Sequence, residues 1–103
     1  MTPITETGKR NNEIRTRGLF ARGPDQVAEL IGTVGIEALG QDAVNDLIRQ
    51  LMAFEDFEEG NDPYGDRDFG KLEYDGKTVI FRIELHEDPD FERRIFLMLP
   101  EDL

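Results

Sequence analysis

The chain changes from a helical pattern to a strand pattern within one decapeptide, Asn61-Asp62-Pro63-Tyr64-Gly65-Asp66-Arg67-Asp68-Phe69-Gly70. Asparagine, aspartate, proline and glycine favour turns, because they fix or relax the backbone angles that a tight turn requires. We therefore predict that this segment, called the 61–70 loop below, is a structural connection. Phe69 is expected to be substantially buried, and Gly65 or Gly70 is expected either to take a positive φ or to lie against another segment.

The segment before the loop predicts the main helix, at residues 41–57. Its apolar residues fall at i, i+3, i+4, i+7 and i+8, which places them on one helix face: Val44, Leu47, Ile48, Leu51 and Met52. Phe54 or Phe57 extends the same apolar face, and Gly60 and Pro63 end the helix. We expect this face to cover one side of a sheet.

The segment after the loop predicts a β-hairpin formed by residues 69–74 and 77–86. Asp75-Gly76 between them is the usual two-residue loop of a type I′ turn, and such a loop fixes the register of both strands. The expected pairs are Tyr74 with Lys77, Leu72 with Val79, Gly70 with Phe81, and Phe69 with Arg82. Residues 93–99 predict a third strand, with Ile95, Leu97 and Leu99 facing the helix.

The first third of the chain gives weaker signals. Residues 1–8 show no period and predict a disordered tail, and residues 9–17 predict a short helix or arm. Residues 26–33 fit either a helix or a buried strand, because periodicity does not separate the two in a short apolar run. The chain as a whole predicts one α+β domain over residues 1–103 with its core at residues 26–99. In it, an antiparallel sheet of three to four strands packs on one main amphipathic helix.

The charge is strongly acidic and unevenly distributed. The formal net charge is −11, and residues 51–103 carry six Lys and Arg against sixteen Asp and Glu. Nucleic-acid binders need a positive surface because phosphate contacts dominate their affinity, so we predict no direct nucleic-acid binding. No apolar run reaches the length of a membrane span, and residues 1–12 lack the apolar core of a secretory signal. We therefore expect a cytoplasmic protein without membrane association.

Two polar groups could carry chemistry. The first is a set of carboxylates before and within the 61–70 loop: Glu55, Asp56, Glu58, Glu59, Asp62, Asp66 and Asp68. Oxygen ligands at this density could bind Ca²⁺ or Mg²⁺, but their spacing does not match the EF-hand loop, and we predict no high-affinity metal site. The second group alternates in sign on one face of the hairpin: Lys71, Glu73, Arg82 and Glu84. It fits either a surface ladder of ion pairs or, with Asp66 and Asp68 at its edge, a cluster that binds an anion.

Two further features are weighed as possible sites. His86 is the single histidine, and among neighbouring acids it is better explained as a surface residue than as a general base. The other feature is an apolar group on the sheet face away from the main helix, formed by Ile80, Phe96 and Met98. This group predicts either a homodimer interface or a surface that the segment around Ile14, Leu19 and Phe20 covers.

The chain also resembles a family of short bacterial proteins known only as a domain of unknown function. The likeness rests on Phe54-Glu55-Asp56-Phe57 and the 61–70 loop, which match the family's F-x-x-F and N-D-P-[HY]-G-E-H-D-F-G motifs. Residues 30–40 resemble its V-x-L-T-x-G-V-x-A-L-[GP], residues 77–85 its W-K-I-D-Y-Y strand, and residues 95–99 its L-T-I-M-L. The resemblance covers most of residues 26–99 and implies a strand, rather than a helix, at about residues 27–33.

Departures from the family pattern fall on charged positions. Asp66-Arg67 stands where the family has Glu-His, and Arg82 and Glu84 stand where it has Lys and Asp. The charge signs persist, but the histidine is lost, so an activity that needed this histidine is not implied. The resemblance brings no activity with it and therefore bears on the fold more than on the function.

The sequence leaves two functional hypotheses. The first is a non-enzymatic interaction or inhibitor-type protein whose acidic half engages a basic partner. The second is a small enzyme, or an ion- or anion-binding module, and convergence of its polar side chains on a pocket would favour it. The candidate binding residues are Asp62, Tyr64, Asp66, Arg67, Asp68, Arg82 and Glu84. No catalytic residue, metal ligand or cofactor is assigned.

Overall fold

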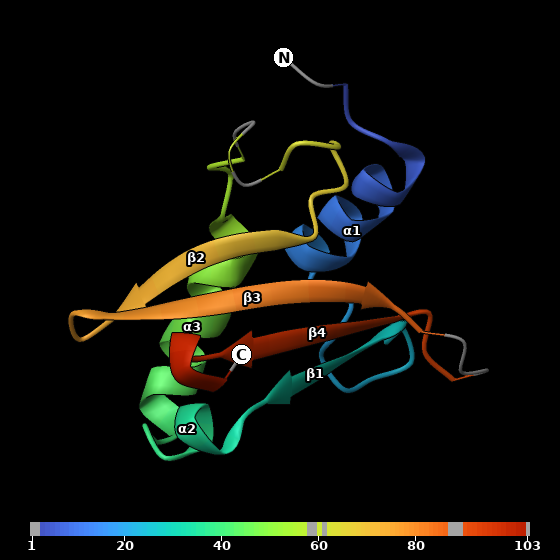
Figure 1. Ribbon diagram of the computed structural model, residues 1–103. Coiled ribbons are helices and arrows are strands. Elements are labelled where there is room, and N and C mark those ends of the chain that lie inside the picture. The colour runs from blue at the N-terminus through green and yellow to red at the C-terminus, as the bar shows by residue number, and fades with distance from the viewer. Residues whose placement is uncertain (1–2, 58–59, 61, 87–89, 103) are drawn as a thin grey trace.

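A mixed four-stranded sheet forms one layer of the molecule, and two helices form the other. The computed structural model describes residues 3–57, 60, 62–86 and 90–102. Its elements are α1 (Glu6–Arg17), β1 (Ala28–Gly32), α2 (Val34–Glu37), α3 (Gln41–Ala53), β2 (Phe69–Tyr74), β3 (Lys77–Leu85), β4 (Arg93–Met98) and the 3₁₀ helix η1 (Pro100–Asp102). The strand order is β1-β4-β3-β2, and α1 and α3 lie behind the sheet in Figure 1. The predicted α+β class is confirmed.

The hairpin forms as the sequence predicts. All four expected pairs are present in the antiparallel register of β2 and β3. Asp75 and Gly76 both have positive φ, at 51° and 76°, which is the backbone of a type I′ turn. The turn therefore sets which hairpin residues face the helices.

The strand at residues 28–32 confirms the choice of strand over helix, but its direction corrects the prediction of an antiparallel sheet. β4 runs antiparallel to β3, whereas β1 runs parallel to β4, with Ala28 opposite Arg93 and Gly32 opposite Leu97. Two parallel strands require a long connection between them, and α2, α3 and the hairpin supply it.

The core lies between the sheet and the helices. Phe81, Ile95 and Leu97 face Leu47 and Leu51 of α3, and all five side chains are buried. Burying residues of this size stabilises the fold by about 1.5–3 kcal/mol each. The sheet face and the apolar stripe of α3 thus meet as the sequence pattern predicts.

The main helix ends at Ala53, four residues before the predicted end at Phe57. The buried Arg15 of α1 donates hydrogen bonds from Nη1 to the carbonyl oxygens of Leu51 at 2.7 Å and Met52 at 3.4 Å, and so caps α3. Phe54 then takes an extended backbone, and its ring meets the Phe57 ring edge to face at 4.9 Å between centroids. The two phenylalanines continue the core but not the helix.

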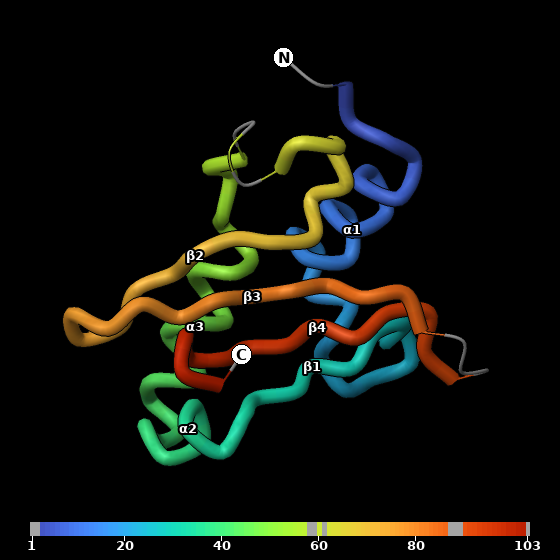
Figure 2. The backbone as a smooth tube through the Cα atoms, in the orientation of Figure 1, coloured from blue at the N-terminus to red at the C-terminus, as the bar shows by residue number. Residues whose placement is uncertain are grey.

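The predicted disordered tail at residues 1–8 is also corrected. Residues 1–2 lie outside the described part of the chain, but α1 begins at Glu6, and the Thr5 side chain caps it by accepting from the Gly8 N–H at 2.9 Å. The Thr5 N–H donates to the Gly65 carbonyl at 3.1 Å, so this segment runs beside the 61–70 loop (Figure 2). Tertiary contacts with the loop order a segment whose own sequence shows no period.

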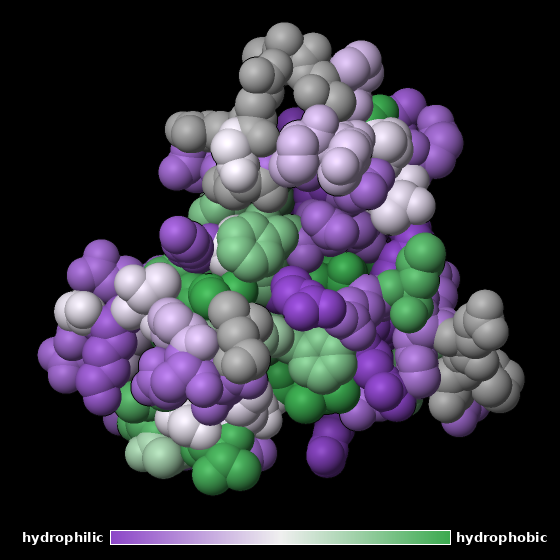
Figure 3. Space-filling view, in the orientation of Figure 1, coloured by the Kyte–Doolittle hydropathy of each residue, from purple (hydrophilic) through white to green (hydrophobic). Residues whose placement is uncertain are grey.

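The outer face of the sheet is only partly open. Ile14 and Phe20 belong to the core on the helix side, so they do not cover the outer face as one alternative proposed. Ile80 and Met98 are nevertheless 5% and 7% exposed, and η1 folds back against β3 on this face. Figure 3 shows apolar surface here interrupted by hydrophilic side chains. A homodimer through this face stays a prediction.

One edge of the sheet is capped by a side chain. The Gln50 amide of α3 donates to the Glu73 carbonyl at 2.7 Å and accepts from the Glu73 N–H at 3.2 Å. It therefore occupies backbone groups that an added strand would use. Within the described residues, no helix is long and apolar enough to cross a bilayer.

Candidate functional site

A cleft of about 470 Å³ lies where β2 diverges from β3 beside α1, and we call it the hairpin cleft. It is lined by Thr7, Asn11, Asp66, Asp68, Phe69, Arg82, Ile83, Glu84, Leu85 and Arg93. Of the predicted binding residues, it brings together Asp66, Asp68, Arg82 and Glu84 and leaves Asp62, Tyr64 and Arg67 elsewhere. The polar side chains of the predicted cluster thus partly converge.

Among the described carboxylates that line this cleft, Asp68 has the fewest side-chain hydrogen-bond donors to balance its negative charge. Its carbonyl accepts from the Ile83 N–H at 2.9 Å, which extends the β2–β3 ladder by one residue and fixes its position. Burial raises the pKa of its carboxyl group, the charges of Asp66 and Asp62 raise it further, and its own N–H and the charge of Arg82 oppose the shift. Among the described residues, no other side chain donates a hydrogen bond to it. A positively charged ligand would therefore stabilise the ionised form of this half-buried carboxylate.

Asp66 sits on the other wall and ties the loop to α1. Its carboxylate accepts from the Thr5 hydroxyl at 2.6 Å, and its carbonyl accepts from the Asn11 side-chain amide at 2.9 Å. Gly65, with φ 75°, permits this approach, because a Cβ there would lie 2.2 Å from the Pro3 carbonyl oxygen. This contact confirms the expected role of Gly65.

Arg82 and Glu84 lie two residues apart on the outer side of β3 and form an ion pair with each other. Both side chains are close to half exposed, so the pair contributes less than about 1 kcal/mol. Phe69 pairs with Arg82 across the strands and is partly buried, as expected, although on the outer face of the hairpin. Phe69 faces outward because the type I′ turn places it on the face opposite Gly70.

Two predicted binding residues, Asp62 and Arg67, instead hold the 61–70 loop in shape. Asp62 is buried, accepts from the Arg67 N–H at 2.9 Å and forms an ion pair with Arg67 Nε at 3.4 Å. The Arg67 guanidinium stacks 4.6 Å from the centre of the Phe57 ring, and Arg67 has φ 53°. Tyr64 is 76% exposed and does not line the cleft. Glu58 and Glu59 of the predicted carboxylate set lie outside the described residues.

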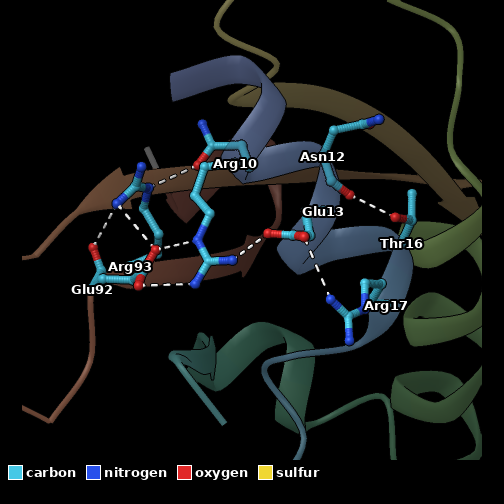
Figure 4. A network of polar contacts seen from close by, with 8 residues as sticks. Arg10, Asn12, Glu13, Thr16, Arg17, Glu92 and Arg93 are labelled. Carbon is cyan, nitrogen blue, oxygen red and sulfur yellow. Dashed lines mark hydrogen bonds and ion pairs between the residues drawn. The ribbon is translucent and has the colours of Figure 1, made fainter. Parts of the chain in front are cut away.

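The sequence did not predict that Asn11 and Arg93 line the cleft. Arg93 is 8% exposed, and it donates from Nε to the Asn11 side-chain oxygen at 2.9 Å and from Nη1 to the Glu92 carbonyl at 3.1 Å. Figure 4 shows these contacts together with the bidentate pair of Arg10 and Glu92, at 2.5 and 3.0 Å. A signal existed: Asn11 precedes the buried Ile14 by three residues and therefore shares its helix face.

The charged groups of this network shift one another's pKa values. The hydrogen bond from Arg10 lowers the pKa of the Glu92 carboxyl group, and the same contact raises the pKa of Arg10. Burial lowers the pKa of Arg93, although the nearby Glu92 opposes the shift. The network thus keeps a guanidinium below the surface of an acidic protein.

Metal binding receives no support from the geometry of the described residues. Across residues 3–57, 60, 62–86 and 90–102, no group of three or more His, Cys, Asp or Glu side chains is arranged to hold a metal ion. His86 follows the last residue of β3 and is not among the residues that line the cleft.

The fold and the cleft define a small two-layer α+β domain with a polar cleft at one end of a mixed sheet. The chain belongs to the family described as protein of unknown function (DUF3768), whose model matches residues 32–95. The match covers α2, α3, the 61–70 loop, β2 and β3, and it includes the last residue of β1 and the first half of β4 but not α1. No curated protein and no solved structure matched the chain.

Proposed function

We propose that this protein is a non-enzymatic binding module that engages a basic partner, and that the hairpin cleft receives a positively charged group of that partner. Asp68 carries the proposal, because its carboxylate is half-buried, lies near two other carboxylates and has a raised pKa. A bound ammonium or guanidinium group would relieve this repulsion and supply the missing donor. The partial convergence of Asp66, Asp68 and Glu84 on one cleft gives such a group a defined place to bind, and it equally favours the second candidate function described below.

The distribution of charge supports the same partner chemistry. Residues 51–103 carry sixteen acids and six bases and contain most of the cleft wall. An acidic surface attracts a basic partner over roughly a Debye length, about 10 Å at 0.1 M ionic strength. Association should therefore be fast at low salt and slow as salt rises.

Asp68 also favours a second candidate function, a small enzyme or an ion- or anion-binding module built on Asp62, Asp66, Asp68, Arg82 and Glu84. A raised carboxyl pKa is the property that a general acid requires. Asp62 weakens this candidate, because it is buried and engaged with Arg67 in shaping the loop.

The test is a titration of the protein with an amidated hexa-arginine peptide at several ionic strengths, followed by calorimetry. Asp68→Asn should weaken binding by about tenfold, because it removes one charge-assisted hydrogen bond. Asp75→Asn is the matched control, since it removes the same charge at the hairpin turn and asparagine accepts positive φ there. Equal effects of the two variants, or binding that salt does not weaken, would contradict the proposal.

A further inference from the structure

Arg93 has one guanidinium nitrogen that no described residue uses. Nε and Nη1 donate to Asn11 and to the Glu92 carbonyl, while Nη2 has no acceptor among the described residues. Figure 4 shows this third nitrogen without a dashed contact. Arg93 lines the hairpin cleft although the residue is only 8% exposed. A buried guanidinium with a free donor at a cleft is suited to an acidic group of a ligand.

The network around Arg93 is a local positive pole. It joins three cations, Arg10, Arg17 and Arg93, to two anions, Glu13 and Glu92. One positive charge is therefore left over beside the cleft, in a chain whose net charge is −11. Asp66 and Asp68 line the same cleft, so it presents carboxylates as well as this guanidinium.

Leu85 also lines the cleft. It pairs with Arg93 across β3 and β4, and Ile83, two residues before it, donates its N–H to Asp68. Leu85 is 68% exposed, one of the three large apolar side chains that stand out on the described surface. The backbones that carry Arg93 and Asp68 are two strand spacings apart, about 10 Å. Arg93 and Asp68 thus line one cleft, with Leu85 on the strand between them.

We infer that the hairpin cleft recognises a basic residue that carries a free α-carboxylate. The carboxylate binds Arg93 Nη2, the methylene groups lie on Leu85, and the cationic head reaches Asp68. This inference rests on the proposed function and narrows it to one ligand chemistry. That chemistry has two sources, a free basic amino acid and the C-terminal arginine or lysine of a polypeptide.

The test compares ligands that differ only in the carboxylate. The probes are acetyl-Gly-Gly-Arg with a free C-terminus, the same peptide amidated, L-arginine, and agmatine, which lacks the carboxylate. The free-acid peptide should bind at least about tenfold more tightly than the amide, because an ionic hydrogen bond is lost in the amide. If L-arginine also binds more tightly than agmatine, and as tightly as the free-acid peptide, the natural source is the free amino acid. If only the peptide binds, the source is a chain terminus.

Variants test whether Arg93 is the residue that binds the ligand carboxylate. Arg93→Lys should bring the ratio of acid to amide affinity towards one, whereas Arg94→Lys, the neighbouring position, whose register partner is Glu84, should leave it unchanged. The ratio in the unaltered protein decides the question even if Arg93→Lys fails to fold. A ratio of one there refutes this inference. If the amidated hexa-arginine peptide still binds through Asp68, the proposed function survives that refutation; if it does not, both fail.

Discussion

Gly70→Ala tests the packing between the hairpin and the segment that follows α3. Gly70 lies in β2 with its Cα against two aromatic rings of the core. A Cβ at this position would lie 2.4 Å from Phe81 Cε1 and 2.8 Å from Phe54 Cε1. Ordinary contacts of a Cβ are about 3.4–4 Å, so the Phe81 ring would have to retreat by roughly 1 Å and the Phe54 ring by roughly 0.6 Å. Their edge-to-face contact, at 5.1 Å between centroids, leaves them little room to do so.

The expected result is a loss of about 1–3 kcal/mol in the free energy of unfolding, the usual cost of overpacking a core. The loss has to exceed an opposing gain, because alanine stabilises a strand over glycine by roughly 0.5–1 kcal/mol. In a domain of this size 1 kcal/mol shifts the melting temperature by about 4–8 °C, so a fall of about 10 °C is expected.

Thermal melts and urea denaturation of the two proteins measure this change. Gly60→Ala is the control, because no atom of the described residues lies within 4 Å of a Cβ added there, and it should melt close to the parent. If Gly70→Ala melts at or above the temperature of the parent, glycine is not required by these rings and the packing described here is wrong.

Three further predictions concern the buried cation, the cleft carboxylate and the N-terminal cap. Arg15→Met should lower the free energy of unfolding in urea by about 1–3 kcal/mol, because it leaves carbonyl groups at the end of α3 without donors; an unchanged midpoint would contradict the cap. Asp68→Asn should stabilise the fold at pH 7 and have no effect at pH 3. The raised pKa of Asp68 means that the folded state loses stability as pH rises from about 3.8 through that pKa, and asparagine removes this loss. Melting curves at both pH values check the sign, and destabilisation at pH 7 would refute it. Thr5→Ala should cost about 1–2 kcal/mol through loss of the cap and of the bond to Asp66; hydrogen exchange that stays slow in α1 would contradict it.

The hairpin could be predicted residue by residue because its information is local. Asp75-Gly76 fixes the turn, and the alternating pattern on either side admits one register. The end of α3 could not be predicted, because Phe54 and Phe57 fit the apolar stripe of a longer helix. The residue that ends α3, Arg15, lies on another helix far earlier in the chain.

The cleft was predictable only in part, for the same reason. Asp66, Asp68, Arg82 and Glu84 lie in or beside the hairpin, so the register alone places them near one another. Asn11 and Arg93 join them from α1 and β4, two elements that meet only in the folded chain. The direction of β1 was equally hidden, since a five-residue apolar strand carries no signal of direction.

The parallel pairing of β1 with β4 has a consequence for how the protein is made. Ala28 and Glu29 cannot pair until the ribosome has added Arg93 and Arg94, more than sixty residues later. The hairpin can close as soon as Leu85 has emerged, but β1 has no strand partner until β4 exists. Distant pairings of this kind slow folding, because loop-closure entropy is lost before the contacts form. Until β4 has emerged, the nascent chain therefore carries β1 without its strand partner, and an unpaired strand edge of this kind is prone to aggregation.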